Sequence, residues 1–232
     1  EKFFTILILD NTFSENMDLK QVVHISFAAK IYSTLVDYLI KDKTVKVIIK
    51  TKKNIKLPID NNLLENAILT NRLEIIQKIG SFAGDFTNKI DLVISFGFYT
   101  PTALLECVIK KVRGVFIDYS NLKSVSKIIY NNNHKNICFS NIDDMMFKLE
   151  KFRKNNTKYN NFGNWDQYIE DIDPFNDNDG SYRIGIFIET LLNNLKNGKD
   201  LREAIKFSKQ KYVKMIKNKY KYSQNIIFSK QV

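Results

Sequence analysis

Short runs of apolar, β-branched residues alternate along the chain with segments whose apolar side chains recur at helical spacing. The short runs predict buried strands, and the segments between them predict amphipathic helices. The predicted strands are Thr5–Asp10, Val45–Lys50, Leu73–Ile76, Asp91–Phe96, Val115–Tyr119 and Ile137–Phe139. The predicted helices cover residues 21–42, 62–70, 81–89, 101–111, 122–130 and 142–153. Because strand and helix alternate, we expect an α/β fold, a Rossmann-like parallel sheet with helices on both faces.

The alternation stops at residue 155. Residues 155–179 are a polar stretch that contains the one tryptophan of the chain, Trp165, and we expect this stretch to be a loop. Apolar spacing then predicts two further helices, at Ser181–Lys196 and Asp200–Lys217. We therefore expect a Rossmann-like domain over residues 1–154, and a loop and C-terminal helices over residues 155–232 that pack on the same domain.

The composition is that of a globular protein. With 232 residues, of which 44% are hydrophobic and 26% are charged, the chain can bury a full core. No apolar run approaches the ~20 residues of a membrane-spanning helix, so an integral membrane protein is not expected. Cys107 and Cys138 lie among apolar residues, which favours buried thiols in a reducing compartment. Because the chain does not begin with methionine, we expect it to be a piece of a longer protein.

The net charge is +11, from 36 Lys and Arg against 25 Asp and Glu. Such an excess favours anionic partners, namely nucleic acid, nucleotide phosphates or an acidic membrane face. Basic residues are concentrated between Arg202 and Lys230, where Glu203 is the one acidic residue. Lysine and asparagine are also frequent in every loop, as in proteins from AT-rich genomes, so codon bias explains the charge equally well.

The clearest candidate site lies where the predicted strand 91–96 ends and the next helix begins. Ligands bind at the carboxyl ends of the strands in open parallel sheets, and Ser95 and Gly97 stand at such an end. The N–H groups at the helix start, with the hydroxyls of Thr100 and Thr102, suit a phosphate or pyrophosphate. Glu106, one turn after Thr102, is placed to accept hydrogen bonds from a ribose. An ordinary turn with a capping threonine and a solvated glutamate explains the same residues.

A basic turn follows the second predicted strand at its carboxyl end. Its lysines, Lys50, Lys52 and Lys53, can bind a diphosphate as point charges. A solvated basic turn is an equally good interpretation of this segment alone.

Motifs of several other functional classes are absent from the sequence. It has no G-x-G-x-x-G after the first strand, no G-x-x-x-x-G-K-[ST] and no G-x-S-x-G. His24 and His134 have no Cys or carboxylate neighbours at metal-ligand spacing, so we expect both to be structural or solvated. If Gly180 is taken as the glycine at position 6 of an EF-hand loop, Ile186 stands at position 12, where the bidentate glutamate belongs. Residues 173–180 therefore indicate a helix start rather than a calcium site.

Three segments follow one another in a recognisable order. They are Lys50-Thr51-Lys52-Lys53, the stretch Ser95 to Glu106, and Asp173-Pro174-Phe175-Asn176-Asp177 followed by Gly180-Ser181 and Arg183. This order resembles the C-terminal half of bacterial surface-polysaccharide biosynthesis proteins of the GT-B glycosyltransferase type. The resemblance covers roughly residues 3–200. Two departures are Thr51, where the family usually has proline, and Asn178-Asp179, which lengthen the last segment.

The resemblance implies that this chain is a donor-binding Rossmann-like domain, residues 1–154, which holds a nucleotide sugar without a metal. The nucleotide sugar would be a substrate, so no cofactor is implied. The general base would come from an N-terminal domain that this chain lacks, and the catalytic residues are therefore unknown; the fragment alone would bind the donor and be inactive. The implied roles are Ser95, Gly97, Thr100 and Thr102 at the donor diphosphate, Lys50 and Lys52 near the phosphates, Glu106 near the ribose, and Arg183 assisting.

The resemblance also implies partners and a location. The acceptor would be a glycan or a lipid-linked glycan, and the protein would be cytoplasmic, with peripheral association at the inner membrane face. A nucleotide-sugar epimerase shares this architecture, but the catalytic carboxylates and histidine pairs expected of it are not evident. From a different class, the alternative is a non-catalytic module that uses the basic C-terminal helix to bind a polyanion, either nucleic acid or an acidic membrane. Under the leading hypothesis nucleic acid is not an expected partner.

Overall fold

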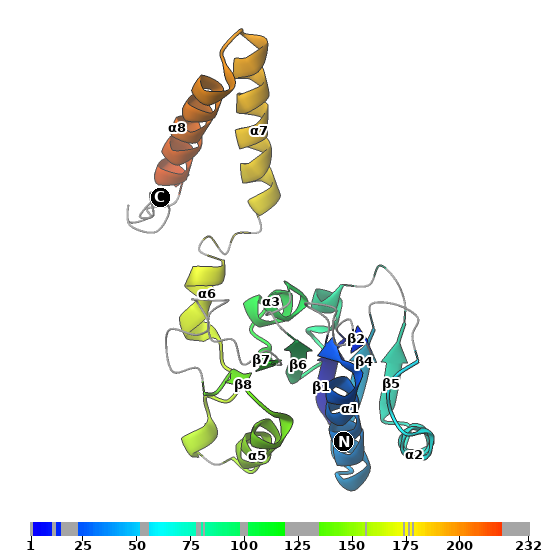
Figure 1. Cartoon of the computed structure of the whole chain (residues 1–232). Coiled ribbons are helices and arrows are strands. Elements are labelled where there is room, and N and C mark those ends of the chain that lie inside the picture. Colours follow the sequence, from blue (N-terminus) through cyan, green and yellow to red (C-terminus); the bar gives the residue numbers. More distant parts are fainter. Residues whose placement is uncertain are drawn as a thin grey trace. The chain divides into compact units, whose positions relative to one another are not determined.

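The computed structural model describes residues 2–10, 13–14, 23–51, 56–77, 80, 82–97, 102–118, 135–155, 157–173, 175, 177 and 179–219. The chain divides into two compact units, unit 1 from Glu1 to Ile172 and unit 2 from Asp173 to Val232 (Figure 1). Each unit has its own secondary structure and is described by itself.

Unit 1 is built on a six-stranded sheet whose strands all run parallel. Its strands are β1 (Phe4–Leu9), β4 (Val45–Lys50), β5 (Leu73–Ile76), β6 (Leu92–Gly97), β7 (Arg113–Asp118) and β8 (Cys138–Phe139). They lie side by side in the order β5-β4-β1-β6-β7-β8, so the order reverses between β1 and β6. This is the doubly wound, Rossmann-like arrangement, and the predicted fold class is confirmed. A short parallel pair, β2 (Phe13–Ser14) and β3 (Val23–His24), was not predicted.

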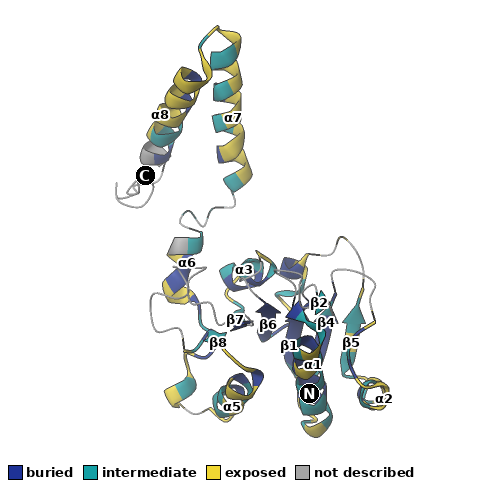
Figure 2. Cartoon of the chain, in the orientation of Figure 1, coloured by how far each residue is buried: buried dark blue, intermediate teal, exposed yellow. Residues whose placement is uncertain are grey.

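Helices cover both faces of the sheet (Figures 1 and 2). One face packs against α1 (Ile25–Lys41), α2 (Asn61–Leu69) and α5 (Ile142–Arg153). The other face packs against α3 (Thr102–Ile109), α6 (Asp166–Ile172) and the short 3-10 helix η1 (Ala83–Phe86). The longest of them, α1, begins where the His24 ring accepts a hydrogen bond from the Ser26 N–H, which gives His24 the structural role expected of it.

The expectation that residues 155–179 form a loop is partly wrong. The stretch contains a 3-10 helix, η2 (Thr157–Tyr159), and α6, and its side chains Phe162 and Trp165 are buried in unit 1. Trp165 donates its indole N–H to the Gly114 carbonyl, 2.8 Å away. A Cβ at Gly114 would lie 2.5 Å from a Val108 methyl, so glycine is needed where α3 meets β7. Seven-residue α6 is too short for its periodicity to be recognised from the sequence.

Unit 1 therefore extends to Ile172, beyond the boundary expected at residue 154. The packing of the remaining C-terminal helices on this domain stays a prediction. The helix expected at 122–130 lies outside the described residues, as does Thr100, the expected cap of the helix that begins at Thr102.

Unit 2 contains an antiparallel pair of helices, α7 (Gly180–Lys196) and α8 (Leu201–Lys219), joined by residues 197–200 (Figure 1). Phe187 of α7 and Tyr212 of α8 meet edge to face, with ring centres 6.0 Å apart. Both helices agree closely with the predicted segments. No helix within the described part of the chain combines the length and the apolar character that crossing a bilayer requires.

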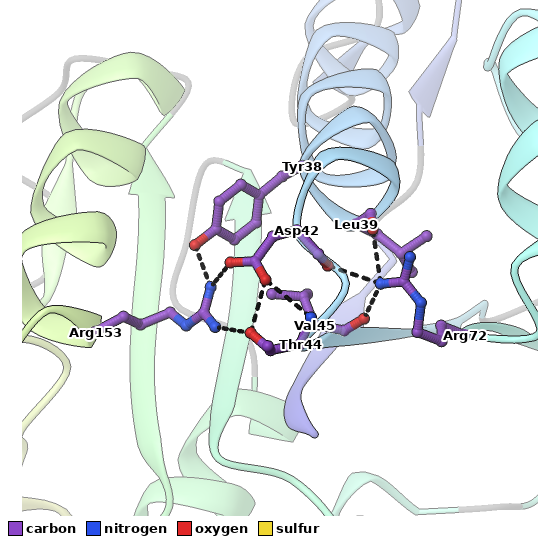
Figure 3. Close-up of polar contacts among 7 residues, drawn as sticks. All are labelled: Tyr38, Leu39, Asp42, Thr44, Val45, Arg72 and Arg153. Carbon is purple, nitrogen blue, oxygen red and sulfur yellow. Dashed lines mark hydrogen bonds and ion pairs between the residues drawn. The ribbon is translucent and has the colours of Figure 1, made fainter. Parts of the chain in front are cut away.

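Two arginines bind the turn between α1 and β4, at the amino ends of the strands (Figure 3). Arg153, the last residue of α5, donates to the Tyr38 hydroxyl and to Asp42 Oδ2, both at 2.5 Å. Its second terminal nitrogen donates to Thr44 Oγ1 at 2.6 Å. These contacts join α5 to α1 across the sheet edge, although the three partners are more than 100 residues away in sequence.

Arg72, just before β5, approaches the same turn from the opposite side (Figure 3). Its Nη1 donates to the carbonyls of Leu39, Asp42 and Val45 at 2.7, 2.7 and 2.6 Å. The last carbonyls of a helix have no partner within the helix and attract a cation. Arg72 therefore satisfies the end of α1 and fixes the direction in which the chain enters β4.

Arg153→Ala is expected to lower the free energy of unfolding by about 2 kcal/mol, because it removes a half-buried guanidinium and leaves Asp42 without its ion pair. Urea unfolding followed by circular dichroism measures the change. The control is Lys154→Ala, the exposed neighbour, which should change stability by less than about 0.5 kcal/mol. Equal stability of the two variants would contradict the role of Arg153.

Asp42 should make the free energy of unfolding depend on pH in the acidic range. Burial by itself raises the pKa of this carboxyl, but hydrogen bonds from Thr44 and Arg153 outweigh burial and hold the pKa below its ordinary value. The stabilisation is complete above the unfolded pKa of roughly 3.9 and is lost as the pH falls through the lower, folded value. Asp42→Asn should therefore lose less stability than the natural chain between about pH 4 and pH 2. Parallel acid-unfolding curves would show that Asp42 does not contribute.

Candidate functional site

Polar side chains gather at the carboxyl ends of the central strands. Strands β1 and β6 are neighbours at the point where the strand order reverses, which is where open α/β sheets bind ligands. Four polar residues lie at or near the carboxyl ends of the four central strands and are at most 7% exposed. They are Asp10 after β1, Thr51 after β4, Ser95 in β6 and Asp118 at the end of β7. Burial of this much polar surface is costly unless each group finds a partner.

Ser95 is the unusual member of this group. It lies on β6 between Leu9 of β1 and Phe116 of β7, and it is 1% exposed. Its hydroxyl has no hydrogen-bond partner among the described residues. Side chains alternate along a strand, and Ile94 and Phe96 belong to the core on the α1 side, so Ser95 points to the face that α3 covers. A buried hydroxyl without a partner costs about 1–3 kcal/mol, which a ligand can recover.

Gly97 ends β6, two residues after Ser95, and is paired with Asp118 of β7. Its φ of 140° lies in a region that side chains rarely adopt, so a larger residue here would be strained. Without a side chain, the backbone at Gly97 can approach a bound group closely. The Asp118 carboxylate lies on the same face as Ser95, because Phe116 and Asp118 are two residues apart on one strand.

Lys50 extends this arrangement across the sheet. It ends β4, is half-buried, and is paired with Leu9, which is in turn paired with Ser95. Lys50 and Ser95 therefore share one face and one row, separated by a single strand. The structure brings together three of the sequence-predicted site residues, namely Lys50, Ser95 and Gly97.

The remaining predicted residues stand differently. Thr102 is exposed and is the first residue of α3, and its predicted role at a phosphate stays a prediction. Glu106 lies one turn along α3 and is half-buried beside Cys107; burial, and then the charge of Glu106, raise the pKa of the Cys107 thiol to about 12. Lys52 and Thr100 lie outside the described residues.

Arg183 belongs to unit 2, and its described contacts are inside that unit. Its Nη1 donates to both carboxylate oxygens of Asp177, at 2.5 and 2.6 Å, and its guanidinium lies 3.9 Å from the centre of the Phe175 ring. This clamp ties Asp177 and Phe175 to α7. The predicted role of Arg183 beside a donor phosphate stays a prediction.

Asp10 is a candidate that the sequence reasoning did not select. It directly follows β1 at the reversal of the strand order and accepts a hydrogen bond from the Tyr32 hydroxyl at 2.5 Å. Burial, and next the charge of Asp10, raise the pKa of Tyr32, so Tyr32 stays a hydrogen-bond donor. The available signal was a carboxylate at the end of the first strand. Its partner, 22 residues away, is visible only in the structure.

The described cavities lie at the opposite edge of the sheet. One of about 270 Å³ is lined by residues around the α1–β4 turn, namely Tyr38, Asp42, Glu150, Arg153 and Lys154. Another of about 260 Å³ is lined mainly by amides near the start of β8, including Asn136, Asn161, Asn164 and Gln167. Neither contains Ser95 or Lys50. Within the described ranges, no three His, Cys, Asp or Glu side chains come close enough to hold a metal ion.

The fold and this edge of the sheet define the chain as a doubly wound α/β protein of the Rossmann-like class. No protein-family model matches the sequence, and a search of curated proteins finds no significant match. A co-structure of S. aureus MnaA with UDP is similar at 13% identity and a TM-score of 0.47, over 83% of this chain and 47% of that chain.

Two other solved structures show a likeness of the same order. Apo-form glycosyltransferase GlyE of Streptococcus pneumoniae TIGR4 has 17% identity and a TM-score of 0.36, over 68% of this chain and 34% of that chain. The structure of accessory secretory protein 1, 2 and 3 in Streptococcus pneumoniae has 13% identity and a TM-score of 0.42, over 86% and 36%. The chain spans less than half of each matched structure. With identities of 17% or lower, the activities of these proteins are not carried over to this chain.

Ser95→Ala should leave the free energy of unfolding of the ligand-free chain unchanged or raise it by up to about 1 kcal/mol, because it removes a buried hydroxyl that has no described partner. Urea unfolding measures the effect. Ser208→Ala is the matched control, since that buried hydroxyl donates to the Ala204 carbonyl at 2.7 Å. A loss of more than about 1 kcal/mol in Ser95→Ala would mean that the hydroxyl is already satisfied in the ligand-free fold.

Proposed function

We propose that unit 1 is the nucleotide-sugar donor-binding domain of a glycosyltransferase that acts in the biosynthesis of a surface polysaccharide. The buried Ser95 hydroxyl at the carboxyl edge of β6 is the observation that carries the proposal. The reversal of the strand order beside β6 supports it, as does the order of the three sequence segments that resemble GT-B enzymes.

The diphosphate of a nucleotide sugar matches the groups at this edge. Its oxygens accept hydrogen bonds, and the Ser95 O–H supplies one donor that is already desolvated. Lys50, on the same face, contributes a positive charge, and Gly97 allows the phosphate to approach the backbone. The eight-residue helix α3 begins after this strand with Thr102, and the N–H groups of its first turn add a partial positive charge. Thr100 and Lys52 complete the proposed phosphate site, and Glu106 binds the ribose.

Glycosyl transfer breaks the bond between the anomeric carbon and the departing nucleotide phosphate. Negative charge grows on the phosphate as this bond breaks, and fixed donors placed around it lower the barrier. In this proposal Lys50, Ser95 and the start of α3 supply that stabilisation without a metal or another cofactor. The general base that activates the acceptor belongs to a part of the protein outside this chain. The chain alone consequently binds the donor but does not transfer the sugar.

The proposal also covers the acceptor, the location of the protein and the role of Arg183. The acceptor is a glycan or a lipid-linked glycan, and the protein is cytoplasmic, where nucleotide sugars are the donors. In this proposal Arg183 assists at the donor phosphate, which requires its guanidinium to exchange Asp177 for that phosphate.

A thermal-shift screen with CMP, UDP, GDP, dTDP and ADP tests the proposal. One nucleotide present at 100 times its dissociation constant should stabilise the fold by about 2.7 kcal/mol, which raises the melting temperature by several degrees. Ser95→Ala should lower the affinity for that nucleotide about tenfold or more, because a hydrogen bond to a charged group is lost. Thr102→Ala combined with Glu106→Ala should abolish binding while the fold is retained.

Two controls separate binding from folding and from general attraction to anions. Ser208→Ala, a buried serine of unit 2, should bind the nucleotide as tightly as the natural chain. A short DNA duplex should give no shift. If no nucleotide stabilises the chain, or if Ser95→Ala binds as tightly as Ser208→Ala, the proposed donor site is wrong. A shift with DNA alone, lost at high salt, would favour the polyanion-binding alternative instead.

A further inference from the structure

Two cavities of unit 1 adjoin at the amino edge of the sheet. The first, of about 260 Å³, lies between the start of β8 and the start of α6, and the second, of about 160 Å³, lies between the end of α3 and α6. Asn164 and Asp166 line both cavities, so the two meet at these residues. Together they reach the lower end of the range of ligand pockets, roughly 300–1,000 Å³. We name the joined cavities the amide groove, after Asn136, Asn161, Asn164 and Gln167.

Backbone hydrogen bonds fix the base of the amide groove. The Gly163 N–H donates to the Asn136 carbonyl, and the Gly163 carbonyl accepts from the Gly114 N–H, both at 2.8 Å. Gly163 has a φ of 67°, and a Cβ there would lie 3.2 Å from the Gly114 nitrogen, so this close approach favours glycine. Ile137 and Tyr168, which also line the groove, are only 2% and 6% exposed. The groove is therefore formed before a ligand arrives, which lowers the cost of binding.

Amide side chains supply most of the polar groups of the groove. An amide carries a donor and an acceptor side by side, and two neighbouring hydroxyls of a sugar ring offer the complementary pair. Asn161 and Gln167 are exposed, so a ligand in the groove reaches their amide groups. Asn164 is already held in place, because its side-chain oxygen accepts a hydrogen bond from the Asp166 N–H at 2.8 Å.

Opposite charges balance in the groove. Asp166 is the one charged residue that lines the first cavity, and its carboxylate lies 3.2 Å from Nζ of Lys111, which lines the second. The hydrogen bond from Lys111 helps to hold the pKa of Asp166 below its ordinary value, so the carboxylate remains an acceptor. Arg113 donates to the carbonyls of Asn160 and Phe162, at 3.0 and 2.6 Å, and is committed to the chain. A phosphate would meet Asp166 and a cation would meet Lys111, so the groove favours a neutral ligand.

We propose that the amide groove is a carbohydrate-binding site separate from the donor edge. It holds one or two neutral sugar units through hydrogen bonds with Asn161, Gln167 and Asp166. The groove lies at the amino edge of the sheet and Ser95 lies toward the carboxyl edge, and the six residues of β6 span about 20 Å between these edges. A sugar in the groove is therefore bound without being transferred. The proposal does not depend on nucleotide binding by unit 1.

An extended peptide is the less suitable occupant of the groove. Peptides in extended conformation bind by adding a strand to a sheet edge, where main-chain groups provide the affinity. The edge strand β8 consists of Cys138 and Phe139, and neither residue lines the groove. Side-chain amides line it instead, and these suit hydroxyl groups.

Saturation-transfer difference NMR with the full chain tests the proposal. The probes are neutral trisaccharides of glucose, galactose, mannose and N-acetylglucosamine, and trialanine is the peptide control. We expect at least one trisaccharide to bind with a dissociation constant near or below about 1 mM, and trialanine not to bind. Asn161→Ala combined with Gln167→Ala should lower the affinity for that trisaccharide about fivefold or more, because hydrogen bonds with two amides are lost.

Asn62→Ala combined with Asn66→Ala is the matched control. Both asparagines are exposed on α2, which packs on the other face of the sheet. This variant and Ser95→Ala should bind the trisaccharide like the natural chain, and circular dichroism checks that each variant keeps its fold. The proposal is overturned if no trisaccharide binds, if trialanine binds in their place, or if the Asn161/Gln167 variant binds as tightly as the α2 variant. Loss of the sugar in Ser95→Ala would also overturn it, because the sugar would then occupy the carboxyl edge.

Discussion

The fold of unit 1 depends on the burial of β1 on both faces. Its residues from Ile6 to Leu9 are buried, and the strand pairs with β4 on one side and β6 on the other. A parallel strand of this kind needs helices above and below it, because every backbone and side-chain position is removed from water. The chain meets this need because β4 and β5 are added on one side of β1, β6, β7 and β8 are added on the other, and helices cover both faces. This arrangement places the reversal of the strand order, and with it the candidate site, between two strands that are buried almost throughout, β1 and β6.

The two edges of the sheet divide stability from the proposed donor binding. At the amino edge, Arg153 and Arg72 satisfy carboxylate, hydroxyl and carbonyl groups, so the turn into β4 has its polar contacts completed within the chain. At the carboxyl edge the Ser95 hydroxyl is buried without a described partner, and Gly97 adopts a conformation that favours glycine. Local violations of packing rules of this kind concentrate at functional sites, where a ligand compensates for them.

Unit 2 follows a different physical logic. Its helices bury a narrow contact line that includes Ala204 and Ser208, and they leave apolar side chains on the outside. A helical pair of this size has little interior, so it cannot bury all of its apolar side chains by itself. The clamp between Arg183 and Asp177 ties Asp177 to α7. Sequence periodicity identified both helices but not which of their apolar residues stay exposed.

The sequence alone determined the fold class and most of the secondary structure, and it named part of the candidate site. β4, β5 and α5 occur at the predicted residues, and Lys50, Ser95 and Gly97 were selected because the carboxyl ends of parallel strands meet at one edge. Periodicity and strand order are local signals, so they can be recognised without a structure. Contacts between distant residues are not local: the Tyr32–Asp10 hydrogen bond, the burial of Trp165 and the missing partner of Ser95 each depend on neighbours from other elements. These features were decided only when the tertiary structure brought those elements together.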